Sequence, residues 1–257
     1  MICTVALAVS ALTLFSGFGL GTALMPAFAL FFPVPVAVAA TAVVHLANNL
    51  FKLALLGRSA AWPVVWRFGI PAALAAFLGA GALVGFASQD ILVEYQLFGR
   101  DLAVTPVKLT IGLLITGFAL LELSPAFAAL AVPPRYLPLG GLLSGFFGGL
   151  SGNQGAFRAA FLIKAGLDKT AFVATGVVCA VIVDVVRLGV YAATLHGQSA
   201  ISLPPGMLEL VAAASLAAFS GAFAGARLLR KVTLRTVQLI VALCMVVIGL
   251  GLASGVI

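Results

Sequence analysis

Charged side chains are the scarcest class in this sequence. They make up 8% of its 257 residues, whereas 63% are hydrophobic, and the mean hydropathy is +1.24. A soluble domain of this size has no means of hiding so much apolar surface from water. Lipid is the solvent that suits such a chain, and a helix needs about 20 apolar residues to span it. We therefore predict an all-α polytopic membrane protein.

Cysteine is also rare, and the motifs of common enzymes are missing. The three cysteines, Cys3, Cys179 and Cys244, are far apart and form no paired motif, which argues against a disulfide framework or a metal site. The sequence has no phosphate-binding P-loop, no metal-ligand spacing and no nucleophile elbow. Its glycine clusters lack the strand–turn–helix context of a dinucleotide fold. We expect no cofactor, no metal and no catalytic residue.

The N-terminal apolar run has no positive charge ahead of it, so we do not predict a secretory signal, although Ala27-Phe28-Ala29 imitates a cleavage site. We interpret it as the first membrane segment. The net charge is +7, which in a soluble protein would suggest nucleic acid as a partner. In a membrane protein, basic cytoplasmic loops explain the excess better. The expected surroundings are therefore a lipid bilayer, without nucleic acid.

Hydropathy divides the chain into about eight hydrophobic segments. Four form a first transmembrane repeat over residues 1–122, and four form a second over residues 137–257, joined by a proline-rich loop at 123–136. The segments lie at about 3–31, 35–56, 69–87, 104–122, 137–163, 170–193, 206–227 and 233–255.

The two repeats are aligned by a constant offset. Gly21 falls on Gly155 and Thr41 on Thr175, and both pairs are 134 residues apart (155 − 21 and 175 − 41). A duplicated membrane domain whose halves each open with an interrupted helix is typical of secondary transporters, which bind substrate between the halves. Alternating access by rocking one repeat against the other is the expected mechanism.

Glycine clusters interrupt the first and fifth segments. Glycine destabilises helices, and Pro26 removes a backbone donor. Non-helical backbone survives at membrane depth only where it is buried in protein or lines a wet cavity. Close packing of small residues on intact helices is the alternative. Because the cluster recurs at the same repeat position, we favour broken helices, with backbone donors at Gly19, Gly21, Gly152 and Gly155.

The number of crossings decides the symmetry of the repeats. Eight crossings make the halves parallel, whereas re-entrant first and fifth segments make them inverted. Basic residues outside the segments divide three to eight between the two sides in the first case and nine to two in the second. Since cytoplasmic loops are enriched in lysine and arginine, the second division slightly favours inverted repeats. Both arrangements place the two termini outside the cytoplasm.

Polar residues follow one face of the second segment. Thr41, His45, Asn48 and Lys52 are spaced at i, i+4, i+7 and i+11, and Asn49 adjoins them. Polar groups inside a membrane usually face a cavity or one another, so these five are candidate substrate ligands. His45 is also a candidate proton carrier. The structural alternative has Lys52 snorkelling to the interface and Asn48 joining helices.

The fifth segment contributes a second polar group. Asn153 and Gln154 lie within the glycine cluster, and Arg158 follows one turn later. Helix N-termini favour negative charge, and the guanidinium group matches the oxygens of carboxylate, sulfonate or phosphate. We therefore expect these residues to bind an oxyanion. Snorkelling is the alternative role of Arg158.

The sixth segment contributes a charged pair. Asp184 and Arg187 are three residues apart, a spacing at which opposite charges pair along a helix. Such a pair is either structural or functional, with Arg187 lending charge to an anion and Asp184 accepting a proton during transport. Thr175, the repeat counterpart of Thr41, is included as a candidate ligand.

These motifs resemble the opening of the sulfite exporter TauE/SafE family. The resemblance rests on the glycine run Ser16–Gly21, Pro26, Pro33 and Pro35, the stretch from Ala40-Thr41 to Asn48-Asn49, and the matching elements Gly148–Gly155 and Ala174-Thr175. It implies a permease of the bacterial inner membrane. Sulfite, sulfonates such as sulfoacetate, and related organic anions are the substrates that the resemblance implies.

The sequence thus predicts a secondary transporter of small anions, with proton coupling as a hypothesis that rests on His45 and Asp184. An anion channel is the main alternative, because basic residues also line anion pores. An intramembrane enzyme would have only Asp184 with His45 as a plausible reacting pair, and no motif supports it. The expected ligand is a small anion. The sequence leaves open whether the protein forms a homodimer.

Overall fold

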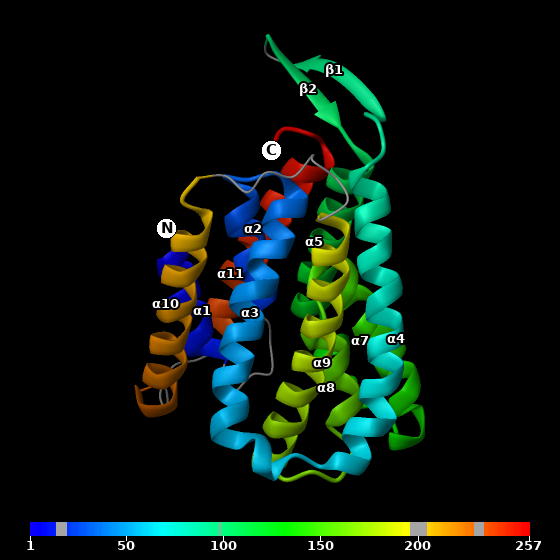
Figure 1. The fold of residues 1–257 in the computed structure, drawn as a ribbon, viewed down its shortest axis with the longest axis vertical. Helices are drawn as coiled ribbons and strands as arrows, with labels where there is room; N and C mark the ends of the chain where they lie inside the picture. The colour runs from blue at the N-terminus through cyan, green and yellow to red at the C-terminus, as the bar shows by residue number, and fades with distance from the viewer. Residues whose placement is uncertain (14–19, 98, 196–204, 229–233) are drawn as a thin grey trace.

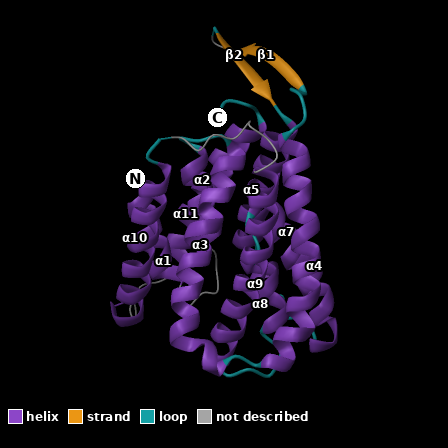
Figure 2. Ribbon diagram, viewed as in Figure 1, coloured by secondary structure: helices purple, strands orange, loops and turns teal. Residues whose placement is uncertain are grey.

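The computed structural model describes residues 1–13, 20–97, 99–195, 205–228 and 234–257. It is a bundle of helices with one two-stranded hairpin at one end (Figures 1 and 2). Short 3-10 turns η1 (Gly57–Ser59) and η2 (Pro134–Tyr136) and strands β1 (Val93–Leu97) and β2 (Arg100–Val104) join helices. The helices are α1 (Ile2–Thr13), α2 (Leu20–Ala29), α3 (Val34–Leu56), α4 (Trp62–Ala87), α5 (Pro106–Leu123), α6 (Pro125–Ala128), α7 (Leu137–Ser151), α8 (Gly155–Leu162), α9 (Lys169–Leu195), α10 (Met207–Leu228) and α11 (Leu234–Ala253).

The predicted all-α membrane fold is confirmed. Within the described ranges, five helices are long and apolar enough to cross a membrane: α3, α4, α5, α9 and α10. Large apolar side chains such as Leu74 and Leu78 of α4 and Leu208 and Leu216 of α10 are more than half exposed. Surfaces of this kind suit contact with lipid rather than water.

The two ends of the bundle are distinguished by the elements that meet there. At the end that we call the hairpin end, the Tyr95 hydroxyl of β1 donates a hydrogen bond of 2.5 Å to the Ser254 carbonyl oxygen, so strands and C-terminus meet there (Figure 1). At the opposite end, the far end, the Ala61 N–H at the start of α4 donates to Thr175 Oγ1 near the start of α9, at 3.0 Å. Helix α3 runs from the hairpin end to the far end, and α4 returns.

The fifth segment is broken, as predicted, and the break reverses the chain. Gly152 ends α7 with a φ of +85°, which glycine adopts without steric cost. Ser144 Oγ of α7 then donates to the Gln154 carbonyl oxygen at 2.9 Å, and the N–H of Val132, before α7, donates to the Ala160 oxygen of α8 at 3.0 Å. Helices α7 and α8 are therefore antiparallel. The fifth segment enters and leaves the bundle at the far end.

The first segment is also divided into two helices, α1 and α2. The residues between them, 14–19, lie outside the described residues, and so does Gly19. Gly21 falls in the first turn of α2, where the backbone alone is described.

Part of the fifth-segment glycine cluster serves close packing instead. Three glycines of α7, spaced four residues apart, face carbonyl oxygens of α4, and a Cβ atom at any of them would collide with that backbone. Small residues at this spacing let membrane helices approach closely. The glycines are Gly141, Gly145 and Gly149, and they face Phe68, Ala72 and Ala76 respectively.

Helices exchange partners between the two predicted repeats. Helix α4 packs against α7, while α10 packs against α1, where a Cβ on Gly221 would collide with the Leu7 carbonyl oxygen. Helix α3 packs against α9 and α5 against α11. A duplication whose halves are related by a two-fold axis, whether parallel or inverted, would give this reciprocal pattern. The repeats and their boundaries at 122 and 137 remain predictions.

The β hairpin between α4 and α5 was not expected from the sequence. Its strands pair in antiparallel register from Val93 opposite Val104 to Leu97 opposite Arg100. Gln96 Nε2 donates to Asp101 Oδ1 at 2.7 Å across the strands. Such short strands carry polar residues, so they give no hydropathy signal beside long apolar helices.

Candidate functional site

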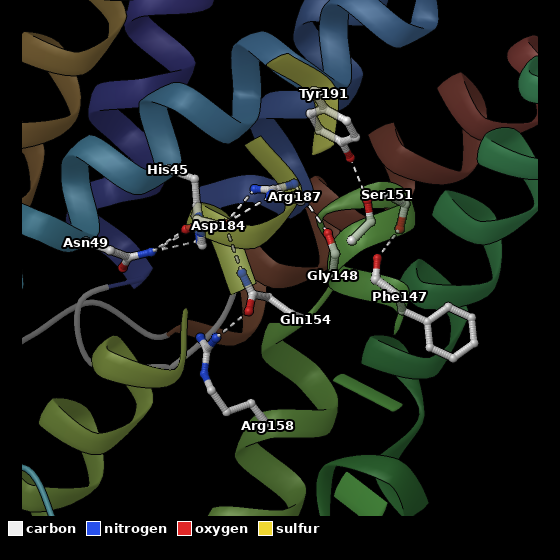
Figure 3. Close-up of polar contacts among 11 residues, drawn as sticks. His45, Asn49, Phe147, Gly148, Ser151, Gln154, Arg158, Asp184, Arg187 and Tyr191 are labelled. Atoms are coloured by element: carbon white, nitrogen blue, oxygen red, sulfur yellow. Dashed lines mark hydrogen bonds and ion pairs between the residues drawn. The ribbon is translucent and has the colours of Figure 1, made fainter. Parts of the chain in front are cut away.

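A carboxylate from α9 is the centre of a buried polar network (Figure 3). Asp184 is fully buried, and its Oδ2 lies 2.6 Å from His45 Nδ1 of α3. Asn49 Nδ2 donates to the same oxygen at 3.3 Å. Gln154 Nε2, from the break between α7 and α8, donates to Oδ1 at 3.2 Å, and Arg187 Nε donates there at 3.0 Å. One carboxylate thus joins α3, α9 and the helix break.

Arg187 neutralises this carboxylate. Its Nη2 lies 2.8 Å from Asp184 Oδ1, and both side chains have no exposed area, so the predicted pairing is confirmed. Arg187 Nη1 also donates to the Gly148 carbonyl oxygen of α7 at 3.4 Å. One turn later in α9, the Tyr191 hydroxyl donates to the Gly149 oxygen at 2.5 Å. These contacts fix α9 against the last turn of α7.

The break itself is partly satisfied from within. The Gly152 N–H donates to the Gly148 oxygen at 3.0 Å, so in this conformation it is already used by α7. Gly155 opens α8, where the first N–H groups of a helix have no acceptor inside it. Asn153 is buried, and no hydrogen bond of its amide is seen within the described part of the chain.

Two cations lie beside the network without a carboxylate of their own. Arg158 of α8 is partly buried, and its Nη1 donates to the neutral Gln154 Oε1 at 3.2 Å. Lys52 of α3 is 8% exposed and makes no hydrogen bond or ion pair among the described residues. It lies about two helical turns after His45 on the same face of α3, and α3 packs against α9, which Arg158 also borders. Gly176 of α9 borders Arg158, since a Cβ there would lie 3.5 Å from Nε.

The charges of this region therefore do not balance. Of the seven acidic residues in the chain, Asp184 is the one that lies in the network, and Arg187 already neutralises it. Lys52 and Arg158 leave an excess of two positive charges. Charges away from water are costly unless they are paired, so an anion is the natural complement of this region.

Two buried atoms on the same face of α3 have no hydrogen-bond partner in the described part of the chain. Asn48 Oδ1 accepts a hydrogen bond of 3.3 Å from Ser10 Oγ of α1, whereas Asn48 Nδ2 has no partner among the described residues. Thr41 Oγ1, nearly two turns before Asn48, likewise has none in the described ranges. Both side chains are buried and lie on the predicted polar face of α3.

Comparison with known proteins assigns the family. Residues 2–252 match the family described as sulfite exporter TauE/SafE. The chain belongs to this family. The resemblance expected from its sequence is thereby confirmed, and membership makes the protein a membrane transporter of sulfite or related anions. No curated protein and no solved structure matches the chain.

Most of the predicted residues of this TauE/SafE protein meet at one place. The structure gathers His45, Asn49, Gln154, Asp184 and Arg187 into one bonded network. It places Arg158 and Asn153 next to that network or at the helix break, and Thr41, Asn48 and Lys52 on the same buried face of α3 as His45. Their role as substrate ligands remains a prediction.

Thr175 lies elsewhere. Its Oγ1 accepts the hydrogen bond from the Ala61 N–H at the far end, two and a half helical turns from Asp184 along α9. In the TauE/SafE protein this threonine therefore holds the start of α4 against α9. The structure does not bring it together with the other candidate ligands.

Two serines were overlooked. Ser10 binds Asn48, and Ser144 binds the backbone of the helix break through Gln154. They are repeat counterparts at the same offset of 134 residues (144 − 10), each ahead of a glycine cluster. Extending the repeat alignment upstream would have found both. Among the described residues, no group of three or more His, Cys, Asp or Glu side chains is arranged to hold a metal ion.

Proposed function

We propose that this TauE/SafE protein carries a small sulfur oxyanion across the bacterial inner membrane. Sulfite, sulfonates such as sulfoacetate, and related organic anions are the substrate class. The observation that carries this proposal is the excess of two positive charges at Lys52 and Arg158, beside a broken helix. A site with an excess of positive charge is suited to binding an anion reversibly.

Binding uses the residues at the break. The Arg158 guanidinium has a fork of donors, one of which already contacts Gln154, and the rest are suited to oxyanion oxygens. The first turn of α8 adds backbone N–H groups and the positive end of its dipole. The Asn153 amide is a further donor. Since Arg187 is neutralised by Asp184, Lys52 rather than Arg187 supplies the second positive charge.

Transport proceeds by alternating access, with a proton as the coupling ion. His45 Nδ1 and Asp184 Oδ2, at 2.6 Å, are a donor and an acceptor between which a proton is readily shared. The carboxylate binds α3, α9 and the break, so a change in the proton held there changes how these three elements are joined. Support for coupling consists of this one contact and its burial.

The far end faces the cytoplasm in this proposal. Basic residues near the helix ends gather there, whereas Arg100 and Lys108 lie at the hairpin end. Cytoplasmic loops are enriched in lysine and arginine. The β hairpin and the C-terminus then lie outside, and we place the N-terminus outside as well. Among the described side chains, those toward the far end include Arg58, Arg67, Arg135, Lys164 and Lys169.

Uptake into proteoliposomes tests this proposal. Sulfite, sulfoacetate and a carboxylate of equal size are compared for the wild type, for Arg158→Ala and for Arg135→Ala, which removes an exposed arginine at the same end. We expect saturable uptake of a sulfur anion that Arg158→Ala abolishes and Arg135→Ala leaves unchanged. Normal uptake by Arg158→Ala would show that the site is wrong. Flux that never saturates, or single-channel currents, would indicate the alternative function, an anion channel.

A further inference from the structure

The two unneutralised cations differ in what they offer an anion. Arg158 presents a planar fork and is held in place by Gln154 Oε1 at 3.2 Å. Lys52 presents a compact charge with three rotatable donors and has no acceptor among the described residues. The first group orients an oxyanion, and the second mainly supplies charge.

The Asp184 carboxylate next to these two cations is already bound by other groups. Asp184 Oδ1 is bound by Arg187 and Gln154, and its Oδ2 is bound by His45 and Asn49. A substrate therefore meets two cations whose charges nothing else in the described chain offsets. A singly charged anion leaves one of the two positive charges uncompensated. That is costly because the Lys52 residue is only 8% exposed. A doubly charged anion balances both.

We propose that the transporter selects doubly charged anions and that Lys52 is the residue that confers this preference. The inference rests on the proposed function and narrows its substrate class. Charge interactions are stronger where water is excluded, so the second charge raises affinity more here than at a protein surface. The preferred substrates are the sulfite dianion rather than hydrogen sulfite, and molecules that carry two acidic groups rather than a single sulfonate.

Sulfate and methanesulfonate are matched probes for this preference. They have the same tetrahedral sulfur head and nearly the same size, but sulfate carries two charges and methanesulfonate one. Binding to the purified full-length transporter is measured by titration calorimetry at constant ionic strength. We expect sulfate to bind roughly tenfold or more tightly than methanesulfonate.

Variants of Lys52 assign the effect to this residue. Lys52→Met removes the charge but keeps most of the side-chain length, and we expect the sulfate preference to fall to about threefold or less while methanesulfonate still binds. Lys52→Arg keeps the charge, and we expect it to keep the preference. Lys164→Met, which removes an exposed lysine at the far end, is the matched control and should behave as the wild type.

The outcomes separate the inference from the function on which it rests. Equal binding of the two probes by the wild type, or a preference that survives in a folded Lys52→Met, would overturn the inference alone. No binding of either probe, or unchanged binding by Arg158→Ala, would overturn the proposed anion site together with it. Lys52→Arg keeps the test decisive if Lys52→Met does not fold, because loss of preference in a folded Lys52→Arg would also contradict the role of its charge.

Discussion

Removal of the Asp184 carboxylate should destabilise the transporter far more than removal of the Arg158 guanidinium. Asp184→Ala leaves Arg187 fully buried without a counter-charge, and it leaves the Gln154 Nε2 donor without its carboxylate acceptor. Breaking a buried ion pair in this way costs about 3–5 kcal/mol. Arg158→Ala removes a charge that has no carboxylate partner, and it frees only Gln154 Oε1, so we expect a loss of about 1 kcal/mol or less.

Thermal unfolding in detergent measures this difference. The thiol of Cys179 is 1% exposed, so its reaction with a thiol-sensitive dye reports unfolding in a background where Cys3 and Cys244 are replaced by serine. Taking roughly 2–4 °C per kcal/mol for a chain of this size, Asp184→Ala should lower Tm by about 6 °C or more. Arg158→Ala should change it by about 4 °C or less.

A double variant tests whether charge is the cause. Asp184→Leu combined with Arg187→Met removes both charges and fills similar volume, and such replacements are often neutral. We expect the pair to recover more than half of the Tm lost in Asp184→Ala. Equal losses in Asp184→Ala and Arg158→Ala would refute the reasoning, because Arg158 would then have a partner as strong as that of Arg187. No recovery in the double variant would show that hydrogen bonds dominate over charge.

Three further predictions concern binding, packing and coupling. Gln154→Glu places a carboxylate next to Arg158, so anion affinity measured by calorimetry should fall roughly tenfold or more, whereas an unchanged affinity would mean that Arg158 does not bind the anion. Gly145→Val should prevent α4 and α7 from packing and lower the yield of folded protein in size-exclusion chromatography, whereas Gly81→Val, with nothing within 4 Å, is the matched control and should fold. His45→Gln should abolish the response of anion uptake to an imposed pH gradient. If uptake by the wild type does not change with the gradient, proton coupling is excluded.

The sequence predicted structure correctly where the membrane restricts the environments that a residue can occupy. The polar face of α3 was predictable because a lysine, a histidine and two amides inside a membrane must face protein or water. The break at Gly152 was predictable because glycine clusters recur at one repeat position. Pairing of Asp184 with Arg187 followed from their spacing along one helix.

Other features depend on contacts between distant segments, and a single sequence does not reveal them. His45 and Asp184 are 139 residues apart, and no local pattern indicates that they meet. Thr175 is a predicted ligand only because it aligns with Thr41 in the repeat. In the structure its hydroxyl oxygen instead accepts a hydrogen bond from the Ala61 N–H, between α3 and α4. The reversal at α8 was one of two options, because glycine content predicts a break but not the direction that follows it.

The contacts between glycine and carbonyl groups on α4 and α7 affect how the protein can move. Backbones that meet at Gly145 and Ala72 without intervening side chains have little freedom to slide, so these two helices shift together. One belongs to the first half of the sequence and the other to the second, and α1 and α10 are joined in the same crosswise manner at Gly221. In the alternating access that we propose, the bodies that rock would therefore combine elements of both halves, rather than being the two repeats themselves. Cleavage of the chain between residues 122 and 137 would separate the two halves of the sequence, but each of these helix pairs would still contain one helix from each half.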